Sequence, residues 1–132
     1  LSSSEGALLL LDLDNFKPVN DEYGHEFGNL VLQKVALRFS RSLPTGAILA
    51  RLGGDEFGVI IEGSYEQTLE SAYALAATLS YPMQIEGRTI KIGVSIGHVY
   101  ADGNSNLLER ADAAMYEAKR TGAGVAQSQP VL

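Results

Sequence analysis

Residues 47–62, AILARLGGDEFGVIIE, decide the fold because two apolar runs flank a polar turn that contains two glycines. Runs rich in Ile, Leu, Val and Phe are typical of β-strands, and glycines between two such runs mark a hairpin. We therefore predict strands over residues 47–52 and 57–62, joined by the tight turn Gly53-Gly54-Asp55-Glu56.

The chain before this hairpin predicts one strand and two helical segments. Residues 7–13 are a continuous apolar run ending in acid, which is typical of a strand buried on both faces. Residues 15–23 are short and polar, and they predict a short helix or turn. Residues 26–43 carry apolar side chains at helical spacing and predict an amphipathic helix, which ends at Pro44.

The chain after the hairpin predicts a helix, a strand pair and another helix. Residues 65–80 and 107–120 have helical spacing, whereas residues 83–86 and 89–100 read as strands on either side of Gly87. Strands interrupted by helices in this order predict an α+β fold, ferredoxin-like or palm-type, in which helices cover a mostly antiparallel sheet.

Composition sets the class of protein and of partner. A chain of 132 residues fits one domain, 1–132, with 45% hydrophobic and 20% charged residues. The net charge of -6 argues against nucleic acid and against direct contact with an anionic membrane, since both need clustered Lys and Arg. Without cysteine there is no disulfide or thiolate metal site, and we expect a cytoplasmic domain. The longest apolar run is too short to span a bilayer.

Two carboxylates stand where chemistry is expected. Asp12 follows the first buried strand and Asp55 lies in the hairpin turn, so neighbouring strands would bring them to one edge of the sheet. Two adjacent carboxylates repel each other unless a cation lies between them, and Mg²⁺ prefers such oxygen ligands. Gly53 and Gly54 would allow positive φ and close approach of a ligand to the backbone. The plainer alternative is a hairpin with a solvated acidic tip.

Four blocks of sequence, in the same order, resemble those of the GGDEF family of diguanylate cyclases. The similarity covers about residues 7–122. The blocks are 51–57 (RLGGDEF), 12–17 (DLDNFK) with 20–21 (ND) and 23–25 (YGH), 95–97 (SIG) and 110–119 (RADAAMYEAK).

The resemblance implies a set of roles for the matching residues. Asp12, Asp55 and the Leu13 carbonyl would hold Mg²⁺, or alternatively Mn²⁺, and Asp55 or Glu56 would take a proton. The family reaction joins two GTP molecules into cyclic di-GMP and releases pyrophosphate, so two domains must face each other as a transient homodimer. The implied substrate-binding residues are Asn15, Phe16 and Lys17 with their amides, Lys17 and Lys119 with their charges, Asn20 and Asn29 at the guanine, and Gly53 and Gly54.

Ordinary structural roles compete with several of these assignments. Asp14 directly precedes a helical turn, so we interpret it as a helix N-cap. Lys119 shares a helix face with Asp112, and the two would form a partly exposed ion pair. His25 and His98 are given no chemistry.

The sequence also departs from the family pattern. Asn29 stands where the family has Asp, so a donor amine faces guanine donors, and we expect weaker guanine binding or relaxed base choice. Ala123 replaces an Arg that would touch phosphate, although Arg120 is near. Residues 44–47, PTGA, replace the Arg-x-x-Asp feedback site, so we expect no cyclic di-GMP binding there. The family's upstream helical segment is missing, which indicates a fragment of a larger multidomain protein.

Three functions follow as hypotheses. The first is an active diguanylate cyclase, supported by the acids and lysines above. The second is a catalytically silent GTP-binding module that regulates an attached sensor or EAL phosphodiesterase domain, which Asn29 and Ala123 favour. The third is another palm-type nucleotidyl transferase, against which the intact Gly-Gly-Asp-Glu-Phe sequence argues.

Overall fold

The computed structural model describes residues 5–101, 103 and 106–128, so both ends of the expected domain range 1–132 lie outside the described residues. Strands and helices alternate much as the sequence predicts. In chain order they are β1 (Gly6–Asp14), α1 (Phe16–Tyr23), α2 (His25–Ser42), β2 (Ile48–Gly53), β3 (Glu56–Glu62), α3 (Tyr65–Thr78), β4 (Met83–Ile85), β5 (Arg88–Ile90), β6 (Gly93–Tyr100), α4 (Leu107–Thr121) and β7 (Val125–Gln127).

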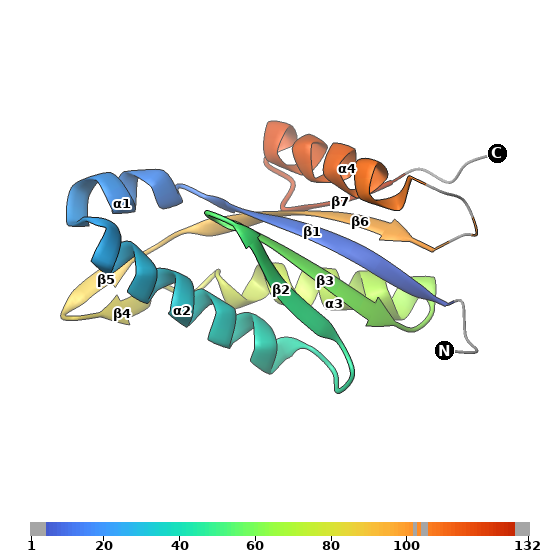
Figure 1. Cartoon of the computed structure of the whole chain (residues 1–132), viewed down its shortest axis with the longest axis horizontal. Helices are drawn as coiled ribbons and strands as arrows, with labels where there is room; N and C mark the ends of the chain where they lie inside the picture. The colour runs from blue at the N-terminus through green and yellow to red at the C-terminus, as the bar shows by residue number, and fades with distance from the viewer. Residues whose placement is uncertain (1–4, 102, 104–105, 129–132) are drawn as a thin grey trace.

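The main sheet has the strand order β2-β3-β1-β6-β7, so β1 is its central strand. The neighbouring pairs from β2 to β6 are antiparallel, and β7 pairs with β6 in parallel. Asp12 near the end of β1 lies between Glu56 on β3 and Ser95 on β6. The predicted α+β fold with a mostly antiparallel sheet is confirmed (Figure 1).

Helices cover both faces of this sheet (Figure 1). The face that carries Leu9, Leu11 and Phe57 packs against α2 and α3 in the larger core. The opposite face packs Leu10 and its neighbours against α4. Period-two alternation along β1 therefore fills two cores, which explains why residues 7–13 read as a continuous apolar run.

The single strand predicted over residues 89–100 is wrong. The structure divides it into β5, which pairs only with β4 in a small separate sheet, and β6, which enters the main sheet. Ile90, Ile92 and Val94 are all buried at a spacing of two, so the apolar alternation continues across the break while the hydrogen-bonding partner changes. Alternation of apolar and polar residues indicates which side chains are buried but not which strand is the hydrogen-bonding partner. The sequence pattern therefore gives no sign of this break.

Strand β7 was not predicted. It has three residues, and only Val125 among them is buried, which gives almost no periodic signal. The chain reaches it through Gly122 and Gly124, both at positive φ, and Ile96 donates its N–H to the Gly124 carbonyl at 2.7 Å. Within the described residues, no helix has the length and hydrophobicity that crossing a bilayer requires.

Candidate functional site

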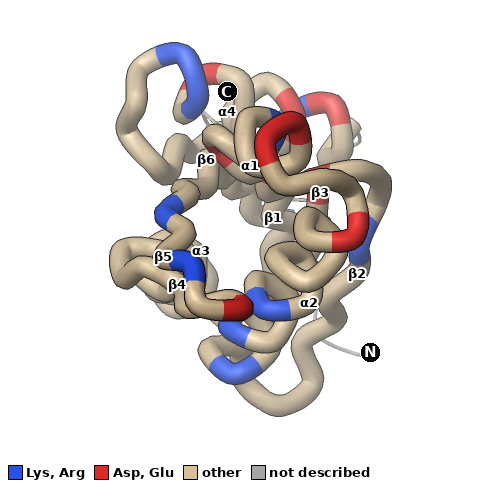
Figure 2. The backbone as a smooth tube through the Cα atoms, turned by 90° about the vertical axis from the view of Figure 1, so that its left-hand side faces the viewer, with Lys and Arg blue, Asp and Glu red and all other residues tan. Residues whose placement is uncertain are grey.

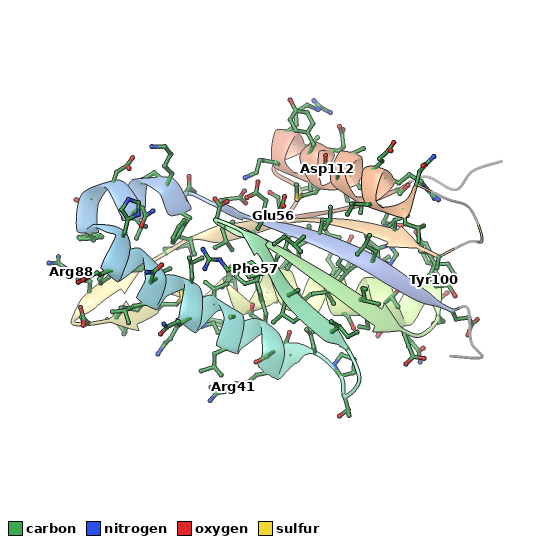
Figure 3. All side chains as sticks on the ribbon, viewed as in Figure 1. Arg41, Glu56, Phe57, Arg88, Tyr100 and Asp112 are labelled. Atoms are coloured by element: carbon green, nitrogen blue, oxygen red, sulfur yellow. The ribbon has the colours of Figure 1, made fainter. Side chains whose placement is uncertain are left out.

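The acids of the hairpin and of β1 meet at one edge of the sheet. Asp12 is the register partner of Glu56, and the Leu13 N–H donates to the Asp55 carbonyl at 3.0 Å, which ties the turn to β1. Figure 3 shows Glu56 at the hairpin tip on the α4 side and Phe57 on the α2 side. The central position of β1 therefore collects side chains from β3 and β6 around Asp12.

The electrostatics of this edge are those of crowded carboxylates with one lysine. Burial raises the pKa of Asp12, the neighbouring Lys119 opposes this rise, and the charge of Asp55 adds to it. The Lys119 Nζ lies 2.8 Å from Asp14 Oδ1 and 3.5 Å from Asp12 Oδ2. Burial alone would lower the pKa of Lys119, but the bond to Asp14 and the charges of both acids raise it overall.

This edge fits a magnesium ion held partly by substrate. Among the described residues, no three His, Asp or Glu side chains converge as a complete metal cage. Asp12 and Asp55 are a neighbouring pair whose mutual repulsion a cation would relieve. Mg²⁺ is commonly bound by one or two carboxylates together with phosphate oxygens. The donor set therefore suits a cation whose remaining ligands are phosphate oxygens better than a free ion.

The glycine turn is open to ligand on its outer side. A Cβ placed on Gly53 or Gly54 would meet no atom within 4 Å. Gly54 has φ 21°, whereas the prediction of positive φ at Gly53 is wrong. A register irregularity between Arg51 and Gly53 bends the strand instead, since a bulge supplies the extra residue. Arg51 Nε donates to the Gly54 carbonyl at 3.0 Å and braces the turn.

Asp14 is not the N-cap of α1, and that prediction is wrong. β1 extends through Asp14, and the cap position falls to Asn15, which has left-handed backbone (φ 65°) and makes no side-chain cap bond. Asp14 instead accepts hydrogen bonds from Ser95 Oγ, at 2.9 and 3.1 Å, and from Lys119. Sequence reasoning gave Ser95 no role, although residues 95–97 (SIG) form one of the blocks that resemble the family.

The first turn of α1 begins beside these acids. The backbone N–H groups at a helix start lack intrahelical partners and suit an anion. Asn15, Phe16 and Lys17 supply these amides, and Phe16 anchors the turn with 6% exposure. The Lys17 side chain, 83% exposed, forms an ion pair with Asp21 at 3.0 Å.

A pocket of about 720 Å³ adjoins this turn and includes Asp14, Asn15, Ser95 and Lys119 in its lining. Figure 2 views the molecule from the α1 end and shows acidic segments near α1 and basic segments near β4 and β5. The charge at this end is therefore mixed and does not form a continuous basic surface.

The two asparagines expected at guanine lie on neighbouring helices. Asn20 of α1 packs against α2 so closely that a Cβ on Gly28 would lie 2.0 Å from its Oδ1. The Asn20 Nδ2 lies 3.1 Å from His25 Nδ1. Asn29, the residue after Gly28, is exposed and lines a separate pocket between α2 and the hairpin, together with Arg51. Asn29 therefore lines a pocket on one side of α2, and the side chain of Asn20 packs against α2 at Gly28.

Other expectations for α4 and β6 are corrected. The predicted pairing of Lys119 with Asp112 is wrong, because Lys119 points to β1. Asp112 lines a small pocket with Glu56 under α4, where Figure 3 labels both. Arg120, considered as a substitute phosphate ligand, forms an ion pair with Glu117 within its own helix. His98 is fully buried, and its Nε2 lies 2.9 Å from Thr68 Oγ1.

Comparison with known proteins identifies the family. The family described as "Diguanylate cyclase, GGDEF domain" matches residues 2–124. The chain is 41% identical over 121 residues to MucR of Pseudomonas aeruginosa, a bifunctional diguanylate cyclase/cyclic di-GMP phosphodiesterase, covering 88% of this chain and 18% of that protein. It is 36% identical over 122 residues to PdeR of Escherichia coli, a cyclic di-GMP phosphodiesterase, covering 89% and 18%.

A crystal structure shows the same fold. The GGDEF domain of TpbB from Pseudomonas aeruginosa superposes with a TM-score of 0.89 at 32% identity, covering 96% of this chain and 84% of that one. The chain spans about a fifth of the length of MucR and PdeR, so it corresponds to one part of such longer proteins. On its sequence match and its fold, the chain belongs to the GGDEF family of diguanylate cyclase domains.

Proposed function

We propose that this domain is a diguanylate cyclase that condenses two GTP molecules into cyclic di-GMP. The observation that carries the proposal is the meeting of Asp12, Asp55 and Lys119 at the edge where α1 begins. Carboxylates for a divalent cation, a lysine and unpaired helix amides are the groups that a triphosphate requires. Relatedness to diguanylate cyclases supports the same reaction.

In this proposal the triphosphate lies between the start of α1 and the acidic edge. The amides of Asn15, Phe16 and Lys17 bind its oxygens, and Lys119 contributes charge from α4. Asp12, Asp55 and the Leu13 carbonyl hold Mg²⁺, or Mn²⁺ in its place. The metal, when bound, makes the hydroxyl easier to deprotonate and neutralises charge on the phosphates. Gly53 and Gly54 leave room for the nucleotide at the turn.

The chemistry is a double nucleotidyl transfer. In each of the two transfers, the 3′-oxygen of one nucleotide forms a bond to the α-phosphorus of the other, and the bond from that phosphorus to the oxygen bridging the α- and β-phosphates breaks. Each transfer releases one pyrophosphate, so the two together release two. The proton of the 3′-hydroxyl passes to a carboxylate, for which Asp55 and Glu56 are the candidates at this edge. Each domain presents one GTP, so we propose that two copies face each other transiently during turnover.

The wider context is also a proposal. We propose that residues 1–132 form one domain of a longer protein that carries a sensor or EAL domain, as the greater length of MucR and PdeR supports. A chain without cysteine suits the cytoplasm. Residues 44–47 hold neither cation nor carboxylate, so we expect no feedback binding of cyclic di-GMP there; binding abolished by mutation of this turn would contradict us.

The test uses the protein with GTP and Mg²⁺, and chromatography of the products. Asp12→Asn and Asp55→Asn should abolish cyclic di-GMP and pyrophosphate, because each removes a metal-binding carboxylate. Glu70→Gln, on an exposed position of α3, is the matched control and should remain active. Full activity of both aspartate variants would refute the proposed metal site.

The second candidate is a silent GTP-binding module. Asn29 in place of the family's Asp, at the pocket between α2 and the hairpin, favours this function. So do the ion pair of Arg120 with Glu117, beside Ala123, and the similarity to a phosphodiesterase. GTP binding without any product, including after Asn29→Asp, would support this function over catalysis. Absence of GTP binding to the unmodified protein would refute both.

A further inference from the structure

The pocket between α2 and the hairpin has the make-up of a site for a planar base. Its volume is about 400 Å³, within the range of small-ligand sites. Its lining combines apolar and polar residues, and the polar ones come from two elements, α2 and β2. The apolar lining residues are Leu32, Ala36, Leu49 and Phe57, and the polar ones are Asn29, Gln33 and Arg51.

Arg51 connects this pocket to the catalytic edge. It is the register partner of Phe57, so its side chain leaves β2 on the sheet face that packs against α2. Its Nε–H donates to the carbonyl of Gly54, the residue before Asp55. That bond fixes the inner part of the guanidinium and uses one of its five donors. A base in the pocket and a phosphate at the acidic edge would thus lie on two sides of Arg51.

The polar groups of this pocket suit one edge of guanine. Guanine offers two acceptors, O6 and N7, on its Hoogsteen edge, and Arg pairs with both in a bidentate manner. Adenine presents an amine donor in place of O6, which an arginine cannot accept. Asn29 alone discriminates poorly, because its amide carries both a donor and an acceptor.

We propose that Arg51 is a specificity-determining residue that reads the O6/N7 edge of the guanine of GTP. The inference rests on the proposed function and assigns base selection to the hairpin as well as to α2. It also gives a reason why a domain with Asn29 can retain preference for guanine. The competing role is purely structural, in which Arg51 only braces the turn through Gly54.

Nucleotide analogues separate these two roles. 7-Deaza-GTP lacks the N7 acceptor, and ITP lacks the exocyclic amine. ATP carries an amine donor where GTP has the O6 acceptor. Affinity for each would be measured by calorimetry with the unmodified protein, Arg51→Ala and Arg51→Lys, and thermal unfolding would be measured in parallel. Arg41→Ala, an exposed arginine on α2, is the matched control.

The unmodified protein should bind 7-deaza-GTP about fivefold to tenfold more weakly than GTP, the effect of losing one hydrogen bond. Arg51→Ala should lose a similar factor for GTP, bind GTP and 7-deaza-GTP equally, and still distinguish ITP as the unmodified protein does. Arg51→Lys should recover affinity only partly, since an ammonium lacks the fork geometry.

Equal binding of GTP and 7-deaza-GTP by the unmodified protein would overturn the assignment of Arg51 alone. If Arg51→Ala still bound GTP more tightly than 7-deaza-GTP, the assignment would also be overturned. Arg51 would then have only the structural role of bracing the turn through Gly54. Failure of every guanine nucleotide to bind the unmodified protein would overturn the proposed function and this inference together.

Discussion

Replacing Gly97 with alanine tests how α4 is held against the sheet. Gly97 lies on β6, facing α4, and an added Cβ would lie 2.2 Å from the Ala111 carbonyl oxygen and 2.3 Å from the Met115 nitrogen. Both obstacles are backbone atoms, so no side chain can rotate away. Ordinary Cβ contacts begin at 3.4 Å, and α4 must therefore withdraw by about 1.2 Å, the difference between 3.4 and 2.2 Å.

The cost follows from overpacking and from the loss of contacts along α4. Forcing extra atoms into a packed core costs about 1–3 kcal/mol. For a domain of this size we expect a fall in Tm of roughly 4–12 °C. The displacement is also large against the 2.8 Å bond between Lys119 and Asp14, so this bond should lengthen or break. Stability and nucleotide binding should therefore fall together.

The assay is urea unfolding, followed by thermal unfolding and GTP affinity. Gly93→Ala is the matched control, because Gly93 lies on the same strand and face, and its Cβ would meet only the Asp14 side chain at 3.5 Å. Gly97→Ala should be less stable than Gly93→Ala by at least about 1 kcal/mol. Equal unfolding free energies for the two variants would show that direct packing of α4 on β6 is not what holds it.

Three further predictions address other contacts. Gly28→Ala should displace the amide of Asn20 and lower the affinity for GTP. Because that side chain is flexible, the unfolding free energy should change by less than about 1 kcal/mol. Unchanged affinity would refute a role for Asn20 in binding GTP. Arg38→Ala should cost about 1–3 kcal/mol in urea unfolding, because Arg38 donates to the carbonyl of Thr78 at the end of α3 and to the carbonyls of Tyr81 and Pro82 just after it. Arg41→Ala, which Figure 3 shows at the outer side of α2, should cost under about 0.5 kcal/mol. Burial lowers the pKa of His98 from 6.5, so the unfolding free energy should decline as pH falls below 6.5, where the unfolded chain gains the proton and the folded chain does not. His98→Gln should lessen this dependence on pH, and an identical dependence in both proteins would contradict the role given to His98.

Local patterns in the sequence predicted most of the elements, and they failed where pairing depends on distant residues. The hairpin at 47–62 and helices α2, α3 and α4 carried strong periodic signals, because each packs one face against a single core. The separation of β5 from β6 left no such signal. Ile90 and Ile92 are buried, as they would also be in one continuous strand, so their pattern does not reveal the break. The parallel strand β7 is too short to show a period at all.

The candidate site shows the same division between local and distant information. Asp12 and Asp55 were placed together because strand ends converge, and this needed only the order of the strands. The partners of Asp14 and Lys119 were missed, because they depend on α4 crossing β6 at close range. Local sequence patterns favoured a helix N-cap role for Asp14 and a pairing of Lys119 with Asp112. Both interpretations relied on residues that are close in sequence, whereas the actual partners are close only in space.

Close packing of α4 is therefore as much a condition for the proposed chemistry as the acids themselves. Lys119 reaches Asp12 and Asp14 only because Gly97 has no side chain and α4 faces β6 with the fully buried Ala111 and Ala118. Lengthening either contact would separate the lysine from the carboxylates, and the repulsion between Asp12 and Asp55 would then have to be relieved by a cation alone. A domain of this kind can keep every residue of its glycine turn and still lose activity through a single methyl group on β6.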